Sequence, residues 1–580
     1  MIAKSIRDMN RLIGLKPTRV KHEVQCKLKS GKLHVTSQRY KTKVARPGEE
    51  QMLKLNIRQS NGTTRTQTAQ MLHLQGRLAK LSVSAPAHGF VQSVETVGRE
   101  SPTSAEEHRT SIMLQALQRR FSLSINPFIT SIWLPLKKTT WVTLPRNRLS
   151  SPVYFPSIRK LNVSQERAVG ATLSIKNADR VVLIHGPPGT GKTTVIAATV
   201  TSLMASADKS CTLWLVAQSN VAVKNIAEKL ASVNFFNFKI IVSKDYHFDW
   251  HEHQYEKIIP NVIRSDSFPE DLVHAERQLQ GSRVMLCTLG MFSNIRLANI
   301  LLLVPPQTVI FDEASQIEVG DYFPMLVQFQ STLQKLVFIG DDKQLAPYGS
   351  TDIPGLESIF EKSHLRKKAI LLDIQYRMPV PIGDFISRNV YKGRLKSQHL
   401  ISDLSCCHFV DVDNGVEESQ GRSWTNAREV DVAVKIASQL TSKGKSYRII
   451  TPYDPQRSRL EQGLKDEGLR WEDRCFNVDS FQGTRIHCVS PQFAHLLAGN
   501  EDDYIVISLV RTHKLGFLNE MRRVNVMLTR CKKGMVICTN RRFIEGPGAK
   551  SLVGKLYGSL GHPVWIDGKD VLSDGVEPFA

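Results

Sequence analysis

Residues 181–194 read VVLIHGPPGTGKTT, an apolar strand followed by a glycine-rich loop and by the start of an Ala- and Val-rich helical segment. The loop matches the pattern G-x-x-x-x-G-K-[ST] in the strand–loop–helix context that this pattern requires. Glycines permit backbone conformations that other residues avoid, so successive N–H groups can point at a phosphate, and the helix N-terminus adds its dipole. The stretch therefore predicts a nucleoside triphosphate site formed by Gly186, Gly189, Thr190, Gly191, Lys192, Thr193 and Thr194.

Two carboxylates after another apolar strand extend the predicted site. The strand TVIF ends in Asp312 and Glu313. We expect Lys192 to contact the β- and γ-phosphates, and Thr193 and Asp312 to hold Mg²⁺. Glu313 would then polarise the attacking water. The sequence thus predicts hydrolysis of ATP with Mg²⁺.

A glutamine follows the strand KLVFIGD (335–341). A glutamine amide can donate a hydrogen bond to a γ-phosphate and accept one from water. We therefore interpret Gln344 as a residue that detects hydrolysis, with a polar surface turn as the alternative.

Strand and helix patterns alternate on both sides of the glycine-rich loop. From about residue 158, short apolar runs alternate with longer helical segments, which is typical of a parallel sheet with helices on both faces. The runs are VVLIHG, LWLVA, KIIVS, RVMLCT, TVIFDE and KLVFIGD, and a second series from about residue 369 contains AILLDI, CHFVDV, SYRIITP, YIVISLV and GMVICTN. The predicted fold class is α/β, with two tandem domains and a cleft that the strand C-termini face.

The order of the motifs resembles that of superfamily 1 helicases, which have two RecA-like P-loop domains. The first-half motifs are LNVSQERAV (161–169), LVAQSNVAVKNI (215–226), CTLGMFSN (287–294), DEASQ (312–316) and GDDKQLAP (340–347). The first resembles the adenine-recognising Q-motif, which implies that Gln165 reads the base. The second resembles motif Ia and implies that Ser219 and Asn220 contact nucleic-acid phosphates. The resemblance gives Thr288 a similar role.

The second half continues the resemblance. Its motifs are IQYRMP (374–379), TPYDPQR (451–457), VDSFQG (478–483) and LNEMRRVNVMLTRCKKG (518–534). They resemble motif IV, a nucleic-acid-contacting loop, motif V and motif VI. The resemblance implies arginine fingers at Arg377 and Arg530, and places Tyr376 near the adenine. It also implies that Thr451 and Pro452 contact nucleic acid.

The sequences GPPGTGKT, DEASQ, QYRM and LTR together resemble the up-frameshift branch, superfamily 1B, among P-loop NTPases of the AAA_11/AAA_12 type. This resemblance implies an ATP-dependent helicase or translocase that moves 5′→3′ on single-stranded RNA or DNA. ATP would lie between the two domains, so that hydrolysis opens and closes the cleft. We find no counterpart of the Cys/His-rich zinc module of the decay-pathway member.

The resemblance breaks in motif V. In the family, FQG runs almost directly into an acidic residue and a strand, whereas here residues 484–499 come between them. Their removal would place Glu501 where the resemblance implies an acid near the nucleotide ribose. Three explanations stay open: a genuine loop, mutation to a degenerate ATPase, and a retained intron. We favour the intron, because a repeated glycine, at 483 and 499, suits an insertion.

The N-terminal quarter differs from the rest of the chain. It shows short alternating runs separated by Gly, Ser and Asn, which predict a β-rich accessory domain, a barrel with a helical stalk. The stalk helix is expected at 104–120, with Ser104 as its N-cap. The expected divisions are 1–125 (accessory domain), 126–157 (proline-rich linker), 158–366 (first RecA-like domain), 367–548 (second RecA-like domain) and 549–580 (C-terminal tail).

Composition restricts the partners and the compartment. The 580 residues have a net charge of +23, which favours polyanionic partners. Nine cysteines lack zinc spacing and any disulfide framework, which fits a reducing compartment. No apolar run approaches the ~18 residues of a membrane span. We expect a monomer of the nucleus or cytoplasm, with a mitochondrial presequence as the less favoured reading of the basic N-terminus.

Three functions compete on this sequence. The leading hypothesis is a motor on single-stranded nucleic acid, favoured by Glu313, Gln344, Arg377 and Arg530. The alternative is an ATP-gated nucleic-acid clamp without robust unwinding, favoured by the interruption at 484–499. A P-loop ATPase acting on protein is the third, and the Q-motif and the paired arginines argue against it. RNA and DNA are not distinguished.

Overall fold

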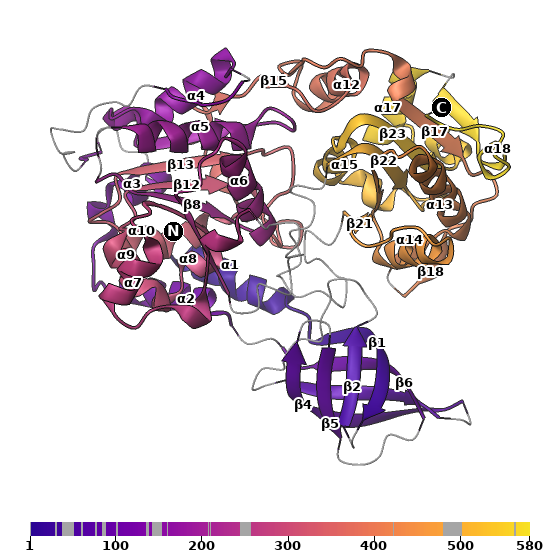
Figure 1. The fold of residues 1–580 in the computed structure, drawn as a ribbon, viewed down its shortest axis with the longest axis horizontal. Helices are drawn as coiled ribbons and strands as arrows, with labels where there is room; N and C mark the ends of the chain where they lie inside the picture. The colour runs from indigo at the N-terminus through magenta and orange to yellow at the C-terminus, as the bar shows by residue number, and fades with distance from the viewer. Residues whose placement is uncertain are drawn as a thin grey trace.

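The computed structural model contains a small β-barrel and two α/β domains (Figure 1). It describes residues 2–29, 32–37, 51–59, 62–75, 78–83, 89–99, 102–134, 139–141, 153–158, 160–206, 208, 210–243, 257–421, 423–478, 501–561 and 564–579. Among these residues, no helix combines the length and the apolar character needed to cross a bilayer.

The barrel is built from the N-terminal strands. The six antiparallel strands close in the order β1-β2-β5-β4-β3-β6. Their bounds are β1 Arg19–Lys29, β2 Lys32–Ser37, β3 Met52–Arg58, β4 Thr64–Gln75, β5 Leu78–Val83 and β6 Phe90–Val97. In β3, Leu53, Leu55 and Ile57 point inward and are buried, as the alternating pattern requires. The prediction of a β-rich N-terminal part is confirmed.

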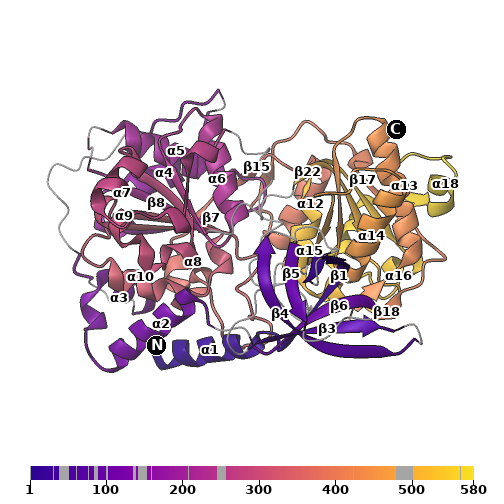
Figure 2. The same ribbon diagram turned by 60° about the horizontal axis from the view of Figure 1, so that its bottom comes forward.

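Two helices flank the barrel in sequence and pack on the first α/β domain. They are α1 (Ile2–Leu15) and α2 (Ser104–Leu117). The N-cap of α2 is Thr103 rather than Ser104, because Thr103 forms a capping box with Glu106. Arg109 of α2 is buried and forms ion pairs with Glu318 and Asp321 of the first α/β domain. The stalk is thus anchored by charge as well as by packing, and Figure 2 shows both helices beneath that domain.

The segment 126–157 differs from the linker expected from its prolines. It contains helix α3 (Pro127–Trp133), which starts with proline at its first position, where the missing N–H costs nothing. Phe128, Ile129 and Ile132 are buried in the core of the first α/β domain. Proline here begins a packed helix, so α3 belongs to the domain.

The first α/β domain is a parallel sheet of eight strands in the order β10-β9-β11-β8-β12-β13-β7-β14. The strands are β7 Val181–His185, β8 Leu213–Ala217, β9 Lys239–Val242, β10 Val262–Arg264, β11 Val284–Thr288, β12 Thr308–Asp312, β13 Lys335–Gly340 and β14 Ile370–Leu371. One face carries α4 Val163–Leu173, α5 Lys192–Ala205 and α6 Asn220–Ser232. The other carries α7 Leu272–Leu279, α8 Leu289–Phe292, α9 Ala298–Leu303 and α10 Phe323–Gln328.

The second α/β domain has a parallel sheet of six strands in the order β21-β20-β22-β23-β17-β24. The strands are β17 Cys407–Asp411, β20 Tyr447–Thr451, β21 Cys475–Asn477, β22 Asp502–Ser508, β23 Cys531–Thr539 and β24 Trp565–Asp567. One face carries α12 Val380–Val390, α15 Met521–Leu528, α16 Arg541–Glu545 and α17 Leu552–Leu560. The other carries α13 Ala427–Ser442, α14 Asp454–Asp466 and α18 Gly568–Leu572.

Two boundaries lie elsewhere than expected. Ile370 and Leu371, expected to open the second series, pair with β7 and so extend the first sheet. The expected tail at 549–580 contains α17, β24 and α18, which complete the second domain. Leu556 of α17 is fully buried there because the helix LVGKLYGSL has a wide apolar face. Two tandem α/β domains with parallel sheets and a β-rich N-terminal part confirm the predicted fold class.

Candidate active site

The glycine-rich loop lies between β7 and α5. Gly189 and Gly191 have φ of 72° and 81°, in the left-handed region that favours glycine. Gly186 is required for a different reason, because a Cβ there would lie 2.4 Å from Cγ of Lys192. The Lys192 ammonium donates to the Gly186 carbonyl at 3.1 Å. The loop thus folds back on its own lysine.

The two acidic residues of DEAS meet this lysine. Oε1 of Glu313 lies 3.6 Å from Nζ of Lys192, and the Glu313 amide donates to Oδ1 of Asp312 at 2.9 Å. Burial raises the pKa of Asp312 to about 7, the charge of Glu313 adds to this, and Lys192 opposes it. Glu313 itself has φ of 50° and directs the chain away from β12. The ionised form of Asp312 is therefore disfavoured here, and a further cation nearby would stabilise it.

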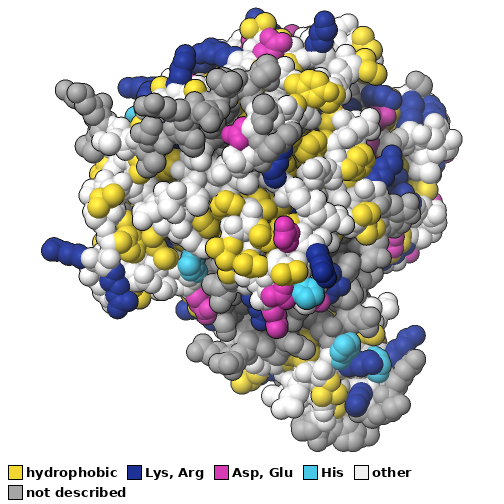
Figure 3. Space-filling model, turned by 60° about the vertical axis from the view of Figure 1, so that its left-hand side comes forward, with side chains coloured by type: hydrophobic (Ala, Val, Ile, Leu, Met, Phe, Trp, Pro, Cys, Tyr) yellow, Lys and Arg dark blue, Asp and Glu magenta, His cyan; other side chains and the backbone are white. Residues whose placement is uncertain are grey.

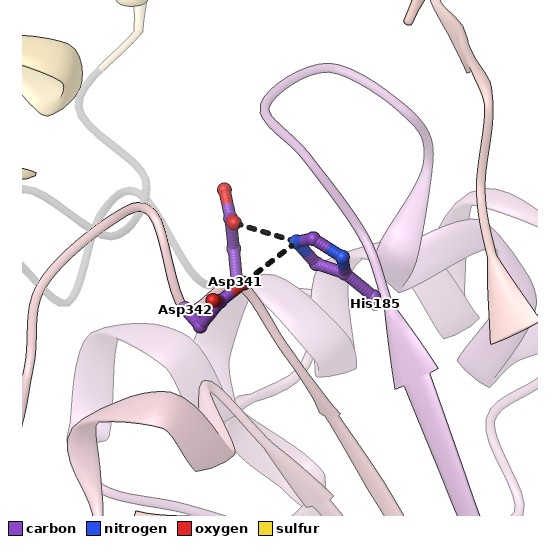
Figure 4. Close-up of side chains that lie close together, drawn as sticks. All are labelled: His185, Asp341 and Asp342. Atoms are coloured by element: carbon purple, nitrogen blue, oxygen red, sulfur yellow. Dashed lines mark hydrogen bonds and ion pairs between the residues drawn. The ribbon is translucent and has the colours of Figure 1, made fainter. Parts of the chain in front are cut away.

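Gln344 follows β13 and is held by Asp341. Its Nε2 donates to Oδ2 of Asp341 at 2.8 Å. His185, at the end of β7, approaches Asp341 and Asp342 at 2.9 and 3.2 Å through Nε2 (Figure 4). Because both neighbours are carboxylates, we assign the proton to Nε2.

The cluster of His185, Asp341 and Asp342 has a metal-ligating composition. However, protein donors already occupy three of the four carboxylate oxygens, and Oδ1 of Asp342 is approached by the same His185 Nε2 that bonds to Asp341. Besides His185 and Gln344, these donors are the Tyr391 hydroxyl and the Lys343 amide for Asp341, and the Arg366 and Lys343 side chains for Asp342. We therefore interpret the cluster as a hydrogen-bonded hub.

Arg377 reaches the glycine-rich loop from the segment that follows β15 (Ile374–Gln375). The amide of Tyr376 donates to the Gly189 carbonyl at 3.0 Å. A Cβ on Gly189 would lie 2.6 Å from Cβ of Arg377, so the two chains pass in close contact. The guanidinium forms an ion pair with Glu501 and donates to the Thr529 carbonyl at 3.2 Å. Arg377 thus lies at the seam between the two domains.

Arg530 lies in the same seam, just before β23. It is buried, its Nε donates to the Val526 carbonyl at 3.0 Å, and its NH2 lies 3.4 Å from Oε1 of Gln344. Burial and then the charge of Arg377 lower the pKa of Arg530 to about 10, while Glu501 and Glu313 oppose the shift. The structure therefore brings Arg530 to Gln344 and Glu313, and Arg377 to the glycine-rich loop of the first domain.

Glu501 is the first described residue after the motif V interruption. Burial alone would raise its pKa, but Arg377 first, and then Lys532, Arg530 and Lys192, hold it below its usual value. The segment 484–499 and most of VDSFQG lie outside the described residues. Glu501 nevertheless lies among the charges of Arg377, Arg530 and Lys192, which fits a position near a bound nucleotide.

Gln165 is tied to the loop from the other side. Its Oε1 accepts from the Asn162 amide and its Nε2 donates to the Thr190 carbonyl, both at 3.0 Å. Asn162 also donates to the Tyr376 hydroxyl at 2.8 Å. Both ends of the Gln165 amide are therefore engaged within the protein, and base recognition stays a prediction for this residue.

The predicted nucleic-acid residues of the first domain lie at neighbouring strand ends. The Ser219 hydroxyl accepts from the Ala222 amide at 3.0 Å and caps α6, whose first residue is Asn220. The Thr288 hydroxyl likewise accepts from Met291 at 3.3 Å. A hydroxyl that accepts from the backbone keeps its own proton to donate. Because β8 and β11 are paired, both hydroxyls lie on one edge of the sheet.

Thr451 and Pro452 of the second domain are buried at the end of β20. Thr451 is 0% exposed, and its hydroxyl has no hydrogen-bond partner within the described part of the chain. As placed, the two residues support the turn into α14. Contact with nucleic acid stays a prediction for them.

Comparison with known proteins follows the same two-part division. Two family models, both described as AAA domain, match residues 160–264 and 356–542. The ATP-dependent helicase upf1 of Schizosaccharomyces pombe is 28% identical over 456 residues, 68% of this chain and 46% of that protein. The two matched AAA domains and this relative support an assignment to the Upf1-like helicases of superfamily 1B. The chain spans less than half the length of this relative.

Other relatives carry different names. A regulator of nonsense transcripts 1 homolog of Arabidopsis thaliana is 29% identical over 456 residues, 69% of this chain and 34% of that protein. The DNA polymerase alpha-associated DNA helicase A of Saccharomyces cerevisiae is 24% identical over 485 residues, 68% of this chain and 66% of that protein. Resemblance within the Upf1-like family therefore does not distinguish RNA from DNA.

Sequence reasoning missed three residues that join the two domains of this Upf1-like chain. Tyr391 donates to Asp341 at 2.5 Å, and Asn525 donates to the Tyr391 hydroxyl at 3.1 Å. Asp341 stands inside a motif that was recognised, but no role was assigned to it. Asn525 likewise lies within the recognised motif VI, and Tyr391 ends α12 outside every motif, so only the placement of the two domains reveals their contact.

Proposed function

We propose that the chain is an ATP-hydrolysing motor that moves along single-stranded nucleic acid. The observation that supports this is that Arg530 of one domain approaches Gln344 and Glu313 of the other, while Arg377 packs on the glycine-rich loop that carries Lys192. A nucleotide held by both domains couples its hydrolysis to their relative position. A P-loop ATPase whose domains did not share the site would lack that coupling.

The first domain would bind the triphosphate. Lys192 and the loop amides would hold the β- and γ-phosphates, beside the positive end of α5. The Thr193 hydroxyl and the Asp312 carboxylate fit Mg²⁺, which prefers oxygen ligands and retains several waters. The raised pKa of Asp312 shows that burial disfavours its ionised form, which the charge of a bound cation would stabilise. When bound, the ion would neutralise phosphate charge.

Residues of both domains would complete the site. Glu313 would orient and deprotonate the attacking water, and Gln344 would contact the γ-phosphate. Arg377 and Arg530 would stabilise the charge that develops on the departing phosphoryl group. Since they belong to the second domain, they do so only while that domain contacts the first.

A single strand would lie across both domains. Ser219, Asn220 and Thr288 offer polar groups at the carboxyl edge of the first sheet. Figure 3 shows Lys, Arg and His side chains on the visible part of the barrel. Exposed basic residues of the barrel strands are Arg19, Lys21, Lys27, Lys32, Arg58 and Arg65. With a net charge of +23, this surface favours phosphate contacts without base specificity.

The ATPase rate with and without poly(U) or oligo(dT) tests the proposal. Strong stimulation supports a motor, and strand displacement from a 5′ overhang but not from a 3′ overhang would establish the polarity that the family implies. Binding of the polymers without stimulation would contradict the motor and favour the ATP-gated clamp. Side-by-side titrations with matched RNA and DNA strands would identify the substrate.

A further inference from the structure

The segment Asp341–Leu345 of the first domain docks on the second domain. Leu345 is buried in the hydrophobic core that α12, α15 and β23 otherwise form. The Tyr391 hydroxyl, at the C-terminal end of α12, donates to Oδ2 of Asp341 at 2.5 Å. Asn525 of α15 donates to that hydroxyl at 3.1 Å and to the Lys343 carbonyl at 2.8 Å. One short loop therefore makes apolar and polar contacts with the facing domain.

These contacts bear on the orientation of Gln344. Oδ2 of Asp341 accepts from Tyr391 and also from Nε2 of Gln344, at 2.8 Å. With its nitrogen on Asp341, the Gln344 amide directs Oε1 at the guanidinium of Arg530, 3.4 Å away. An amide turned by 180° would present its NH₂ to that cation instead. Asp341 thus selects the orientation in which the Gln344 amide and Arg530 attract each other.

The donor and the acceptor keep their roles across the working pH range. Burial and then the charge of Asp341 raise the pKa of Tyr391 well above its usual value, so the hydroxyl stays protonated. Burial alone would raise the pKa of Asp341, but His185, Lys192 and Tyr391 together lower it, so the carboxylate stays ionised. A hydrogen bond from a hydroxyl to a buried carboxylate is a strong one.

We propose that Tyr391 is a positioning residue which, through Asp341, holds the Gln344 amide toward Arg530 while the two domains are in contact. The bridge makes the orientation of Gln344 depend on the second domain. This inference rests on the proposed function, because it links domain contact to the rate of ATP turnover.

The test is a double-mutant cycle in the full chain, with ATPase measured at saturating poly(U). Tyr391→Phe keeps the ring and removes only the hydroxyl. We expect kcat to fall about tenfold, the size expected for one hydrogen bond to a charged group, while KM for ATP stays within error and the Tm falls by only a few degrees. The matched control is Tyr557→Phe, which removes a hydroxyl bonded to Glu545 at 2.7 Å, outside the cleft.

The cycle with Gln344→Ala separates positioning from packing. If Tyr391 acts through Gln344, the double variant is no slower than Gln344→Ala alone, because the group being positioned is already gone. Independent losses that multiply, or Tyr391→Phe with wild-type kcat, would overturn the inference. If poly(U) does not stimulate the wild-type ATPase, only the proposed motor function is contradicted, because the double-mutant cycle can still be measured on the unstimulated rate. No wild-type turnover contradicts both.

Discussion

The two α/β domains contribute their candidate site residues from different positions in similar sheets. In the first domain, Lys192, Glu313 and Gln344 all follow the carboxyl end of a strand, β7, β12 or β13. In the second, Arg530 immediately precedes β23, at the amino end of that strand, and Arg377 follows the short strand β15. The general rule that ligands bind at the carboxyl ends of parallel strands thus predicts the first set and not the second.

The two sets also differ in what holds them. The groups of the first domain are fixed by their own strands and by each other, as in the contact of Lys192 with Glu313 at 3.6 Å. The arginines meet the first domain across the seam, where Arg377 packs on Gly189 and Arg530 faces Gln344. Nucleotide binding should therefore survive loss of the arginines, whereas hydrolysis should not.

The largest effect is expected from the lysine of the glycine-rich loop. Lys192→Ala removes the cation nearest to both the loop carbonyl and Glu313, so ATP turnover should fall roughly a thousandfold or more. ATP affinity should fall with it, which a fluorescent nucleotide titration would measure. Exposed Lys176 of the same domain is the control, and its alanine variant should hydrolyse ATP normally. Turnover retained in Lys192→Ala would refute the assigned site.

Glu313→Gln should separate binding from hydrolysis. The amide keeps the size of the side chain but cannot accept the proton of the attacking water, so kcat should fall about a hundredfold to a thousandfold. ATP should still bind, since Lys192 and the loop remain. ATPase rate and nucleotide affinity are measured together, with exposed Glu276→Gln as control. A variant that hydrolyses ATP at the normal rate would mean that another residue activates the water.

Substitution of the two arginines should lower kcat to different extents. Arg377 is neutralised by its ion pair with Glu501, whereas Arg530 is fully buried and its pKa is lowered to about 10. We expect Arg530→Gln to lower kcat about a hundredfold and Arg377→Gln less, both with ATP affinity largely kept. Exposed Arg459→Gln in the same domain is the control. If an arginine variant lost as much ATP affinity as Lys192→Ala, the division of roles would be wrong, since only the first domain is expected to be needed for ATP binding.

Local sequence patterns predicted most of the candidate site residues of the first domain. The glycine-rich loop, Asp312–Glu313 and Gln344 each stand directly after an apolar strand, so sequence spacing alone places them at one edge. The arginines were assigned by family resemblance, because nothing local to Arg377 or Arg530 indicates where the second domain sits. How residues that are distant in sequence meet, as Tyr391 and Asp341 do, depends on the final packing of two domains.

In the expected linker and tail, by contrast, local sequence gave the wrong expectation. Both were assigned from composition, yet Phe128 and Leu556 are buried core residues. Helix α3 begins with proline, and α17 comprises nine residues, so each gives a weak periodic signal. Their burial follows from the apolar surface that each neighbouring sheet leaves to be covered, which no local window of sequence contains.

The smallest expected effect concerns the pH dependence of stability, and it follows from a comparison of one buried carboxylate from each domain. Asp341 lies against His185 and has a lowered pKa, whereas the donors to Glu429 are neutral: the Ser508 hydroxyl at 2.6 Å and the Val510 amide at 2.8 Å. Burial therefore raises the pKa of Glu429 to about 8, although these hydrogen bonds oppose it. Since the unfolded value is 4.5, the folded protein binds more protons between the two pKa values.

Stability should consequently fall as the pH rises through this window from about 4.5 to about 8, and level off above it. Glu429→Gln removes the titration, so the Tm of wild type should decline more steeply between pH 5 and pH 8 than that of the variant, by several degrees. Differential scanning calorimetry at fixed ionic strength would measure both curves. Parallel curves would mean that Glu429 is ionised in the folded protein, and that the second domain stabilises a buried charge as effectively as His185 does in the first.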